Sequence, residues 1–389
     1  MTEIYLDNSA TTPLCEAAKR AMVSALDVYG NPSSLHKVGL AAGELLSRSR
    51  EKILSTLGQR GAKPENLIFT AGGTEADNLA IFGVAYAKSR RAQNRIITTD
   101  SEHSAVESAM KKLEADGFEV VRLSTRGGVI DFDEFKTAMN ERTLLVSIMT
   151  VNNETGAKYN VKELFGYAKS VNRDVVTHTD AVQGYLKFRL SPAEIGADLV
   201  SISSHKIHGP KGVGALYVSP EIIKRKQIIP TLLGGGQESG FRSGTENIIG
   251  IAGFAAAAEE GYKNIASNLA KVHELYEYAI EKLYALDVKL NIPKGERAPH
   301  IINLTLPCIK SETMLHYLSN DGICVSSGSA CSSHSRSVSP ALHGFGLSDF
   351  DADCSIRVSL SHYNTKEDVD ALAESLSSGI SRLVRINRK

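Results

Sequence analysis

The sequence has no excess of charge of either sign, no long apolar run and no paired cysteine motif. Its 44 lysines and arginines balance 44 aspartates and glutamates, so no net field favours nucleic acid or an anionic membrane. No apolar stretch approaches the roughly 18 residues that a membrane span requires. We therefore expect neither a nucleic-acid partner nor a membrane-spanning segment.

The cysteines are odd in number and scattered, and none forms a C-x-x-C pair. Such spacing is poor for a zinc or iron–sulfur site, so we predict no resident metal. The N-terminal stretch "MTEIYLDNSATTP" has early acidic residues and no apolar signal region. Together these features predict a cytoplasmic protein whose thiols stay reduced. The five cysteines are Cys15, Cys308, Cys324, Cys331 and Cys354.

Strand-like and helix-like segments alternate through the first two thirds of the 389 residues. The stretches "RIITTDSEH", "TLLVSIMTVNNETG", "DVVTHTDAVQG" and "ADLVSISSHKIHGPKG" each read as an apolar run that ends in polar residues. Strands that are apolar on both faces indicate a mostly parallel sheet in an α/β domain. Ligands of such sheets bind beyond the carboxyl ends of the strands, where these polar residues are expected to meet.

The pattern changes near residue 260. Residues 260–287 read as one long amphipathic helix, followed by a strand ("HIINLTL"), a helix from Ser311, a strand ("SIRVSL") and a last helix. Thr365 and Asp368 are spaced as a capping box for that last helix. We predict a large domain, residues 16–259, and a smaller α+β domain made of residues 1–15 and 260–389.

The stretch "AGGTEADNLA" places Gly73 and Thr74 between a strand and a helix. Backbone N–H groups at a helix N-terminus bind phosphate, and glycine permits close approach. The alternative is a tight turn in which Thr74 is the helix N-cap. The stretch matches neither the Walker nor the Rossmann glycine pattern, which argues against a nucleotide site of either type.

Asp180 and Gln183 follow an apolar strand in "THTDAVQG". A carboxylate there can pair with a protonated ring nitrogen of a cofactor, and an amide can bond a ring oxygen; Asp180 is equally good as a helix cap. His103, in "DSEHSAV", follows another strand, where an imidazole can stack on a cofactor ring and move protons. A lone histidine is more often structural.

Lys206 lies between a strand and a glycine-rich turn, after Ser203 and His205. A lysine in a partly desolvated crevice has a lowered pKa and forms a Schiff base with an aldehyde. The neighbouring hydroxyl and imidazole are suitable phosphate donors; the alternative is a solvated loop lysine. Asn153, in "VNNETG", adds an amide, and Arg357, in "SIRVSL", offers a planar fork for a carboxylate or else a surface ion pair.

The stretch "VSSGSACSS" carries Cys331 among small residues. Such residues supply backbone freedom, and a packed core needs larger side chains, so we predict a mobile segment with a thiol at its tip. The alternative, a small buried hydrophobic residue, fits this composition badly.

Together these motifs resemble the NifS/IscS-like cysteine desulfurases, in the class V aminotransferase group of fold-type I pyridoxal phosphate enzymes. The resemblance covers nearly the whole chain. It rests on the order and spacing of "YLDNSATTP", "GNPSSLH", "GGTEADN", "EHSAV", "VNNETG", "DAVQ", "SSHKIHGPKG", "GFRSGTEN", "VSSGSACSS" and "IRVSL". One departure is His208, where tyrosine is common in relatives.

The resemblance implies a large domain with a mostly parallel seven-stranded sheet and a role for each matched residue. Lys206 would bind the cofactor aldehyde and move the substrate proton, His103 would stack on the pyridine ring, and Cys331 would accept the sulfur. Asp180 would pair with the ring nitrogen and Gln183 with the ring oxygen. The remaining implied roles are phosphate binding by Gly73, Thr74, Ser203 and His205, phosphate binding in the neighbouring subunit by Thr245, and substrate binding by Asn153 and Arg357.

The implied reaction converts L-cysteine to L-alanine and leaves a persulfide on Cys331, which only the thiolate can form efficiently. The implied cofactor is pyridoxal 5'-phosphate, and the implied partners are a second copy of the chain and a sulfur acceptor such as an iron–sulfur scaffold. Cys331 would be at most a transient iron–sulfur ligand. Two alternatives remain open, a selenocysteine lyase or other class V aminotransferase-like enzyme, and a non-enzymatic iron–sulfur carrier.

Overall fold

The computed structural model describes residues 3–59, 61–87, 93–327 and 339–387. Its central feature is a seven-stranded sheet in the order β2-β8-β7-β6-β5-β3-β4. Only β8 runs against its neighbours, since its pairings with β2 and β7 are antiparallel and the other pairings are parallel. The prediction of a mostly parallel seven-stranded sheet is therefore confirmed. The strands are β2 (Leu67–Thr70), β3 (Arg95–Thr99), β4 (Glu119–Leu123), β5 (Thr143–Ser147), β6 (Val176–Asp180), β7 (Leu199–Ser203) and β8 (Gly214–Val218).

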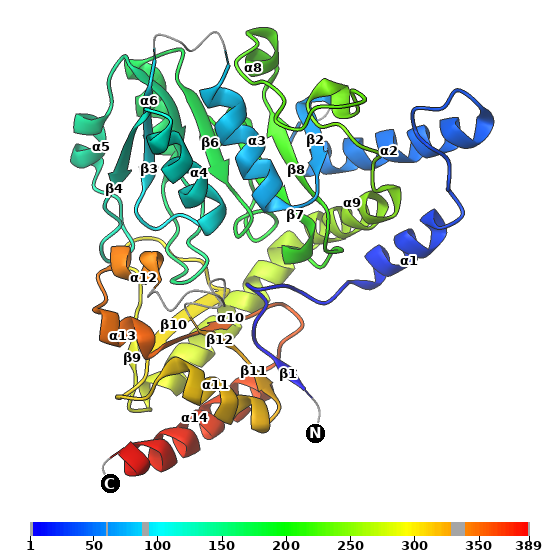
Figure 1. Ribbon diagram of the computed structural model, residues 1–389. Helices are drawn as coiled ribbons and strands as arrows, with labels where there is room; N and C mark the ends of the chain where they lie inside the picture. Colours follow the sequence, from blue (N-terminus) through cyan, green and yellow to red (C-terminus); the bar gives the residue numbers. More distant parts are fainter. Residues whose placement is uncertain (1–2, 60, 88–92, 328–338, 388–389) are drawn as a thin grey trace.

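Helices cover both faces of this sheet (Figure 1). One face packs against α3 and α4 through buried Leu79, Ile81 and Met110. The other face lies over a core that includes Phe165 of α6 and Phe254 of α9. Because both faces are covered, the central strands β5, β6 and β7 are buried along their whole length, as their apolar runs predict. The helices of this part are α1 (Glu16–Ala25), α2 (Lys37–Thr56), α3 (Gly73–Ala85), α4 (Ser104–Ala115), α5 (Phe132–Ala138), α6 (Val161–Val171), α7 (Pro192–Ile195), α8 (Pro220–Lys224) and α9 (Ile248–Lys263), with short 3-10 turns η1 (Pro64–Asn66), η3 (Ser204–Lys206) and η4 (Glu238–Gly240).

The second part of the molecule is built on a four-stranded antiparallel sheet in the order β12-β13-β10-β9. Its core lies between this sheet and α10, α11 and α14. The N-terminal strand β1 pairs in parallel with β11, so Ile4 lies opposite Ile323. The division at residues 15 and 260 stays a prediction. The elements are β1 (Ile4–Tyr5), α10 (Ile265–Tyr284), β9 (Lys289–Leu290), β10 (Ile301–Thr305), α11 (Ser311–Asn320), β11 (Ile323–Cys324), β12 (Ser326–Ser327), α12 (Pro340–Phe345), α13 (Asp349–Asp353), β13 (Ser355–Ser359) and α14 (Lys366–Asn387).

The single long helix expected over residues 260–287 is wrong. Two helices, α9 and α10, meet at Asn264, whose backbone (φ −104°, ψ 9°) ends the first and begins the second. Asparagine favours such boundaries because its side chain competes for backbone hydrogen bonds. The capping box before α14 is confirmed. The Thr365 N–H donates to Asp368 at 3.1 Å, and the Asp368 N–H donates to the Thr365 hydroxyl at 3.3 Å.

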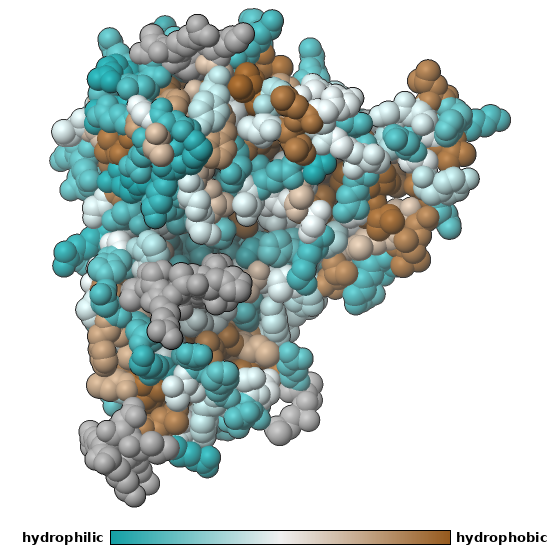
Figure 2. All heavy atoms as spheres, in the orientation of Figure 1, coloured by the Kyte–Doolittle hydropathy of each residue, from teal (hydrophilic) through white to brown (hydrophobic). Residues whose placement is uncertain are grey.

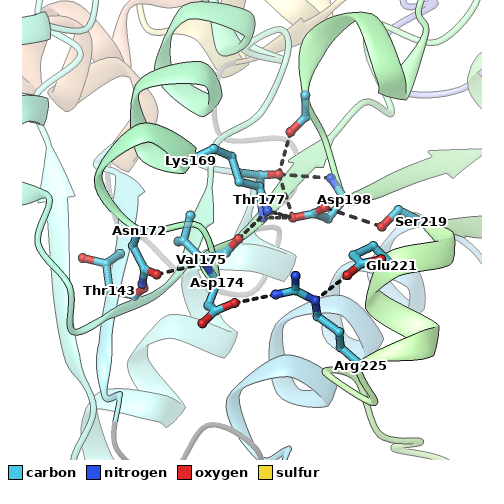
Figure 3. Close-up of polar contacts among 11 residues, drawn as sticks. Thr143, Lys169, Asn172, Asp174, Val175, Thr177, Asp198, Ser219, Glu221 and Arg225 are labelled. Atoms are coloured by element: carbon cyan, nitrogen blue, oxygen red, sulfur yellow. Dashed lines mark hydrogen bonds and ion pairs between the residues drawn. The ribbon is translucent and has the colours of Figure 1, made fainter.

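Polar contacts fasten the amino ends of β6 and β7, the edge of the sheet opposite the strands' carboxyl ends (Figure 3). The Asp198 carboxylate accepts bonds from the Lys169 ammonium and from the N–H and hydroxyl of Thr177. These contacts join α6 to the first residues of two central strands. They fix the amino ends of the two strands relative to α6. In the part of the chain that the structure describes, no helix is both long and apolar enough to cross a membrane.

Candidate active site

A cavity of about 320 Å³ lies beyond the carboxyl ends of β6 and β7. All predicted site residues line it except Thr245 and Cys331. Cys331 lies outside the described residues. Thr245 is exposed in the loop before α9 and does not line this cavity. The lining residues are Ser9, Ala10, Gly73, Thr74, Asp77, His103, Met149, Val151, Asn153, Asp180, Val182, Gln183, Ser203, His205, Lys206 and Arg357.

Lys206 ends the short turn η3, which follows directly from β7, so the strand aims its side chain into the cavity. Its ammonium donates to the backbone carbonyls of Ser9 and Ala10, the second at 2.9 Å. The Gln183 amide also donates to the Ser9 carbonyl, at 2.9 Å. The N-terminal segment therefore forms one wall of the site and holds both side chains.

Asp180 is the last residue of β6 and is buried. One carboxylate oxygen accepts a bond from the Val182 N–H at 2.8 Å. A turn follows Asp180 and no helix begins there, so the alternative of a helix cap is wrong. Burial raises its pKa, while nearby His103 and Lys206 lower it. The other oxygen is thus a strong acceptor for a cationic N–H donor in the cavity.

His103 is the N-cap of α4, and its Nδ1 accepts a bond from the Ala105 N–H at 3.2 Å. A neutral ring must therefore carry its proton on Nε2. Burial lowers the pKa of His103, with the charge of Asp180 acting against that shift. The ring is held as a neutral, oriented imidazole beside Asp180.

One end of the site fits a phosphate. Gly73 is the first residue of α3, and a methyl group on it would lie 2.7 Å from Cγ2 of Val182. The N-cap is Gly72, so the alternative of Thr74 as N-cap is wrong. Among the described residues the buried Ser203 hydroxyl has no hydrogen-bond partner. An adjoining hollow of about 570 Å³ is lined by Gly72, Gly73, Thr74, Ser203 and His205 among others. Free N–H groups of a 13-residue helix and an unpartnered hydroxyl are what a phosphate needs.

Arg357 lies at the far end of the cavity, in β13 between two core residues, so the predicted strand alternation is confirmed. It is only 4% exposed. Its Nη1 donates to the Asn153 carbonyl and its Nη2 to the Asp7 carboxylate, both at 2.9 Å. The buried Nε has no hydrogen-bond partner among the described residues. An unsatisfied donor on a buried guanidinium favours an incoming carboxylate.

These features fit pyridoxal phosphate. The cavity offers a primary amine for an aldehyde, a carboxylate for a ring N–H, an imidazole for a ring face and a helix N-terminus for a phosphate. The hydrogen-bond donors for the cofactor phosphate, at Gly73 and Ser203, and the donor for a substrate carboxylate, at Arg357, line the same cavity. No group of three metal-ligating side chains occurs in the described ranges.

The comparisons agree with this geometry. The family model "Aminotransferase class-V" matches residues 4–372. "Cysteine desulfurase IscS" of Dictyoglomus turgidum is 40% identical over 389 residues, covering 99% of this chain and 96% of that protein. "Cysteine desulfurase 1" of Trichormus variabilis is 39% identical over 387 residues, covering 98% and 94%. A solved structure described as "NIFS-LIKE PROTEIN" has a TM-score of 0.90 at 33% identity and covers 98% of this chain and 100% of that one.

The chain belongs to the cysteine desulfurases of the class V aminotransferase family.

Sequence reasoning missed several residues of this cysteine desulfurase site. The carbonyls of Ser9 and Ala10 carry no residue signature, because any residue supplies a carbonyl. Asp7 sits in "YLDNSATTP", a motif that sequence reasoning used only as a family marker. The pattern of strands in the sequence does not predict that Asp7 pairs with Arg357, which lies 350 residues away.

Three further carboxyl groups with raised pKa values lie in the site of this cysteine desulfurase or next to it in the chain. Asp77 lines the cavity, and Glu102 precedes His103. Glu154 accepts a bond from the Ser339 hydroxyl at 2.6 Å. Burial raises the pKa of all three, to about 8 for Glu102 and about 7 for Glu154. Of the three, only Asp77 lines the cavity, and its raised pKa favours the protonated form, whereas the positive charge of Lys206 acts to keep Asp180 ionised.

Proposed function

We propose that this protein takes sulfur from L-cysteine, releases L-alanine, and passes the sulfur on as a persulfide of Cys331. The observation that carries the proposal is one cavity in which the Lys206 amine, the Asp180 carboxylate and the Arg357 guanidinium face each other. An amino acid needs these three groups: one to exchange with its amine, one to charge the cofactor ring and one to hold its carboxylate. We propose pyridoxal phosphate as the cofactor.

When bound, pyridoxal phosphate supplies an aldehyde for the amine and a protonated ring that withdraws electrons from the substrate. Asp180 would keep the proton on the ring nitrogen, and Gln183 would bond the ring oxygen. His103 would cover one face of the ring. Gly73, Thr74, Ser203 and His205 hold the phosphate, because they line the two adjoining hollows at the N-terminus of α3.

Lys206 is the proton carrier at the substrate Cα. Its ammonium rests on two carbonyls at the wall of the cavity, within the same space that the substrate enters. Arg357 and Asn153 fix the substrate carboxylate, which accepts a hydrogen bond from the Arg357 Nε that has no partner among the described residues. The contacts of Arg357 with Asp7 and with the Asn153 carbonyl hold the guanidinium in place for this bond.

The Cys331 thiolate attacks the substrate sulfur. The S–Cβ bond breaks, the new S–S bond forms, and the proton balance gives alanine and a Cys331 persulfide from cysteine and one thiol. The segment that carries Cys331 leaves β12 beside the substrate arginine, since Ser326 pairs with Arg357 across the sheet. Three residues separate Ser327 from Cys331 in the sequence, so four Cα–Cα steps limit the distance between these two residues to about 14 Å. The proposal requires that this length of chain brings the thiol to the substrate.

A second copy of the chain completes each site in this proposal. Apolar side chains project from α1, α2 and the segment between them, and Figure 2 shows them as brown patches on the arm at the right. Tyr29 is 82% exposed and Leu35 is 90% exposed, and such a patch marks an interface. Thr245 is exposed in a loop that Arg50 anchors through Glu238, and we assign it to the partner's phosphate.

The persulfide goes to an acceptor protein such as an iron–sulfur scaffold, with Cys331 at most a transient cluster ligand. We place the reaction in the cytoplasm, where thiols stay reduced. The rival functions share the cofactor. A transaminase needs no tethered thiol, and a selenocysteine lyase differs in its substrate.

Mass spectrometry after one turnover with L-cysteine tests the proposal. We expect one added sulfur on Cys331 of the wild type and none in Cys331→Ser, which keeps the yellow colour of the bound cofactor. Lys206→Ala should lose both the colour and the sulfur transfer. Cys308→Ser, which removes an exposed thiol elsewhere, is the matched control and should react like the wild type. Sulfur release by Cys331→Ser at the wild-type rate would refute the assigned role, and preference for selenocysteine with no persulfide would favour the lyase.

A further inference from the structure

A second, smaller cavity lies where the loops after β6 and η3 meet α10 and the end of β13. Its volume is about 50 Å³, room for a few non-hydrogen atoms, since one water needs about 10–15 Å³ on the same scale. It shares no lining residue with the proposed active site. Its walls are Leu186, Lys187, Ile207, His208, Gly261, Asn268, Leu269, Val272, Pro299, His300, Leu360, Ser361 and His362.

Two deeply buried histidines line this cavity with an unpartnered ring nitrogen. His208 is 6% exposed and His300 is 3% exposed. Neither Nε2 has a hydrogen-bond partner among the described residues. Buried polar atoms are nearly always satisfied, so two orphaned nitrogens on one small cavity indicate a missing ligand.

The other ring nitrogen of each histidine is already used. The His208 Nδ1 donates to the Pro13 carbonyl at 3.0 Å, and the His300 ring bonds the backbone of Gln183. Both neutral rings therefore present Nε2 as a free lone pair. Burial lowers the pKa of both, and so does the charge of Lys187, so a ring takes up a proton near neutral pH only when an anion bound beside it offsets these effects.

Lys187 supplies a positive charge without a counter-ion. It is partly buried, and none of the ion pairs found among the described residues involves it. Burial lowers its pKa to about 8, so it remains mostly charged at neutral pH. The other charges that act on this cluster are also positive, namely Lys271 on His362 and Arg357 on His300. A partly buried ammonium with no anion near it gains from a ligand that supplies a negative charge.

We propose that this cavity binds a small monocarboxylate of about the size of acetate. The carboxylate oxygens of the ligand pair with Lys187. One imidazole Nε2 takes up a proton from solvent and donates a hydrogen bond to the ligand. The apolar end lies against Ile207, Leu269 and Val272. A metal cation is disfavoured by the ammonium, and a phosphate is too large for the space. No covalent bond forms or breaks, and the net change is uptake of up to one proton.

Saturation-transfer difference NMR on the holoenzyme with sodium acetate tests this inference. The wild type should transfer saturation to the acetate methyl, more strongly at pH 6.5 than at pH 8. Formate should compete for the cavity, and benzoate should not because it is too large. Lys187→Met should reduce the signal at least fivefold, while Lys224→Met, which removes an exposed charge on α8, should leave it unchanged. An absent signal in the wild type, or an equal one in Lys187→Met, overturns the proposal.

Thermal unfolding gives a second readout for the same variants. Acetate should raise the Tm of the wild type above that in an equal concentration of chloride, because a ligand that binds only the folded state stabilises it. Lys187→Met should unfold no lower than the wild type in chloride and should gain nothing from acetate. His300→Gln keeps Lys187 and should flatten the pH dependence of acetate binding. Equal stabilisation by chloride and acetate would refute a carboxylate site.

Discussion

Glu102 offers a test of the electrostatics beneath the proposed cofactor site. One of its carboxyl oxygens accepts bonds from the Thr99 hydroxyl at 2.8 Å and from the Met149 N–H at 3.1 Å. The other is buried without a hydrogen-bond partner in the described part of the chain. Burial raises the pKa of Glu102 from 4.5 to about 8, despite those two bonds. The folded protein therefore holds a proton that the unfolded chain releases.

The sign of the pH dependence follows from linkage. Between pH 4.5 and 8 the folded state binds more protons at Glu102 than the unfolded state does, so the free energy of unfolding falls as pH rises. Each pH unit inside that window costs up to about 1.4 kcal/mol. From pH 5.5 to 7.5 this residue therefore lowers the free energy of unfolding by up to about 2.7 kcal/mol.

Glu102→Gln should remove this dependence, because the amide keeps the acceptor oxygen and does not titrate. Urea unfolding of both holoenzymes at pH 5.5, 6.5 and 7.5 measures the difference. Over that range we expect the free energy of unfolding of the variant to rise by about 2–3 kcal/mol relative to that of the wild type. The difference between the two proteins at any single pH is not diagnostic, because the new NH₂ group of the glutamine is also buried. Absorbance of the bound cofactor confirms equal loading. Curves that stay parallel across the range would show that Glu102 is ionised in the folded protein and refute the reasoning.

Two further predictions concern the phosphate end and the loop that carries Thr245. A methyl group at Gly73 would lie 2.7 Å from a valine side chain, so Gly73→Ala should weaken cofactor binding at least tenfold in a spectrophotometric titration; Gly166→Ala in α6, where an added methyl group has nothing within 4 Å, is the control and should bind normally. Glu238→Gln should lower the free energy of unfolding by about 3–5 kcal/mol, because it leaves the buried Arg50 charge without its partner at 2.7 Å. Replacing both residues by methionine should recover much of that loss in the same urea assay, and equal instability of the single and double variants would contradict this account.

The fold and most of the cavity followed from sequence because they depend on local patterns. Apolar runs predicted the buried strands, and strand ends placed Asp180 and Lys206 at one edge of a parallel sheet. The same reasoning does not find site contacts that are made by backbone groups or by residues far apart in the sequence. Ser9 and Ala10 act through carbonyls, and Asp7 reaches Arg357 only through the tertiary fold. Asn264 interrupts a continuous amphipathic pattern that gave no sign of a break.

The N-terminal wall of the site has a consequence for synthesis. The Asn8 amide bonds the Ser359 carbonyl at 2.9 Å, and the Ser9 N–H bonds the Ser359 hydroxyl at 2.8 Å. Asn8 and Ser9 precede Ser359 by 351 and 350 residues, so these contacts form only after the chain as far as β13 has been made. The carbonyls that receive Lys206 therefore depend on a contact of very long sequence separation, which we expect to form late in folding.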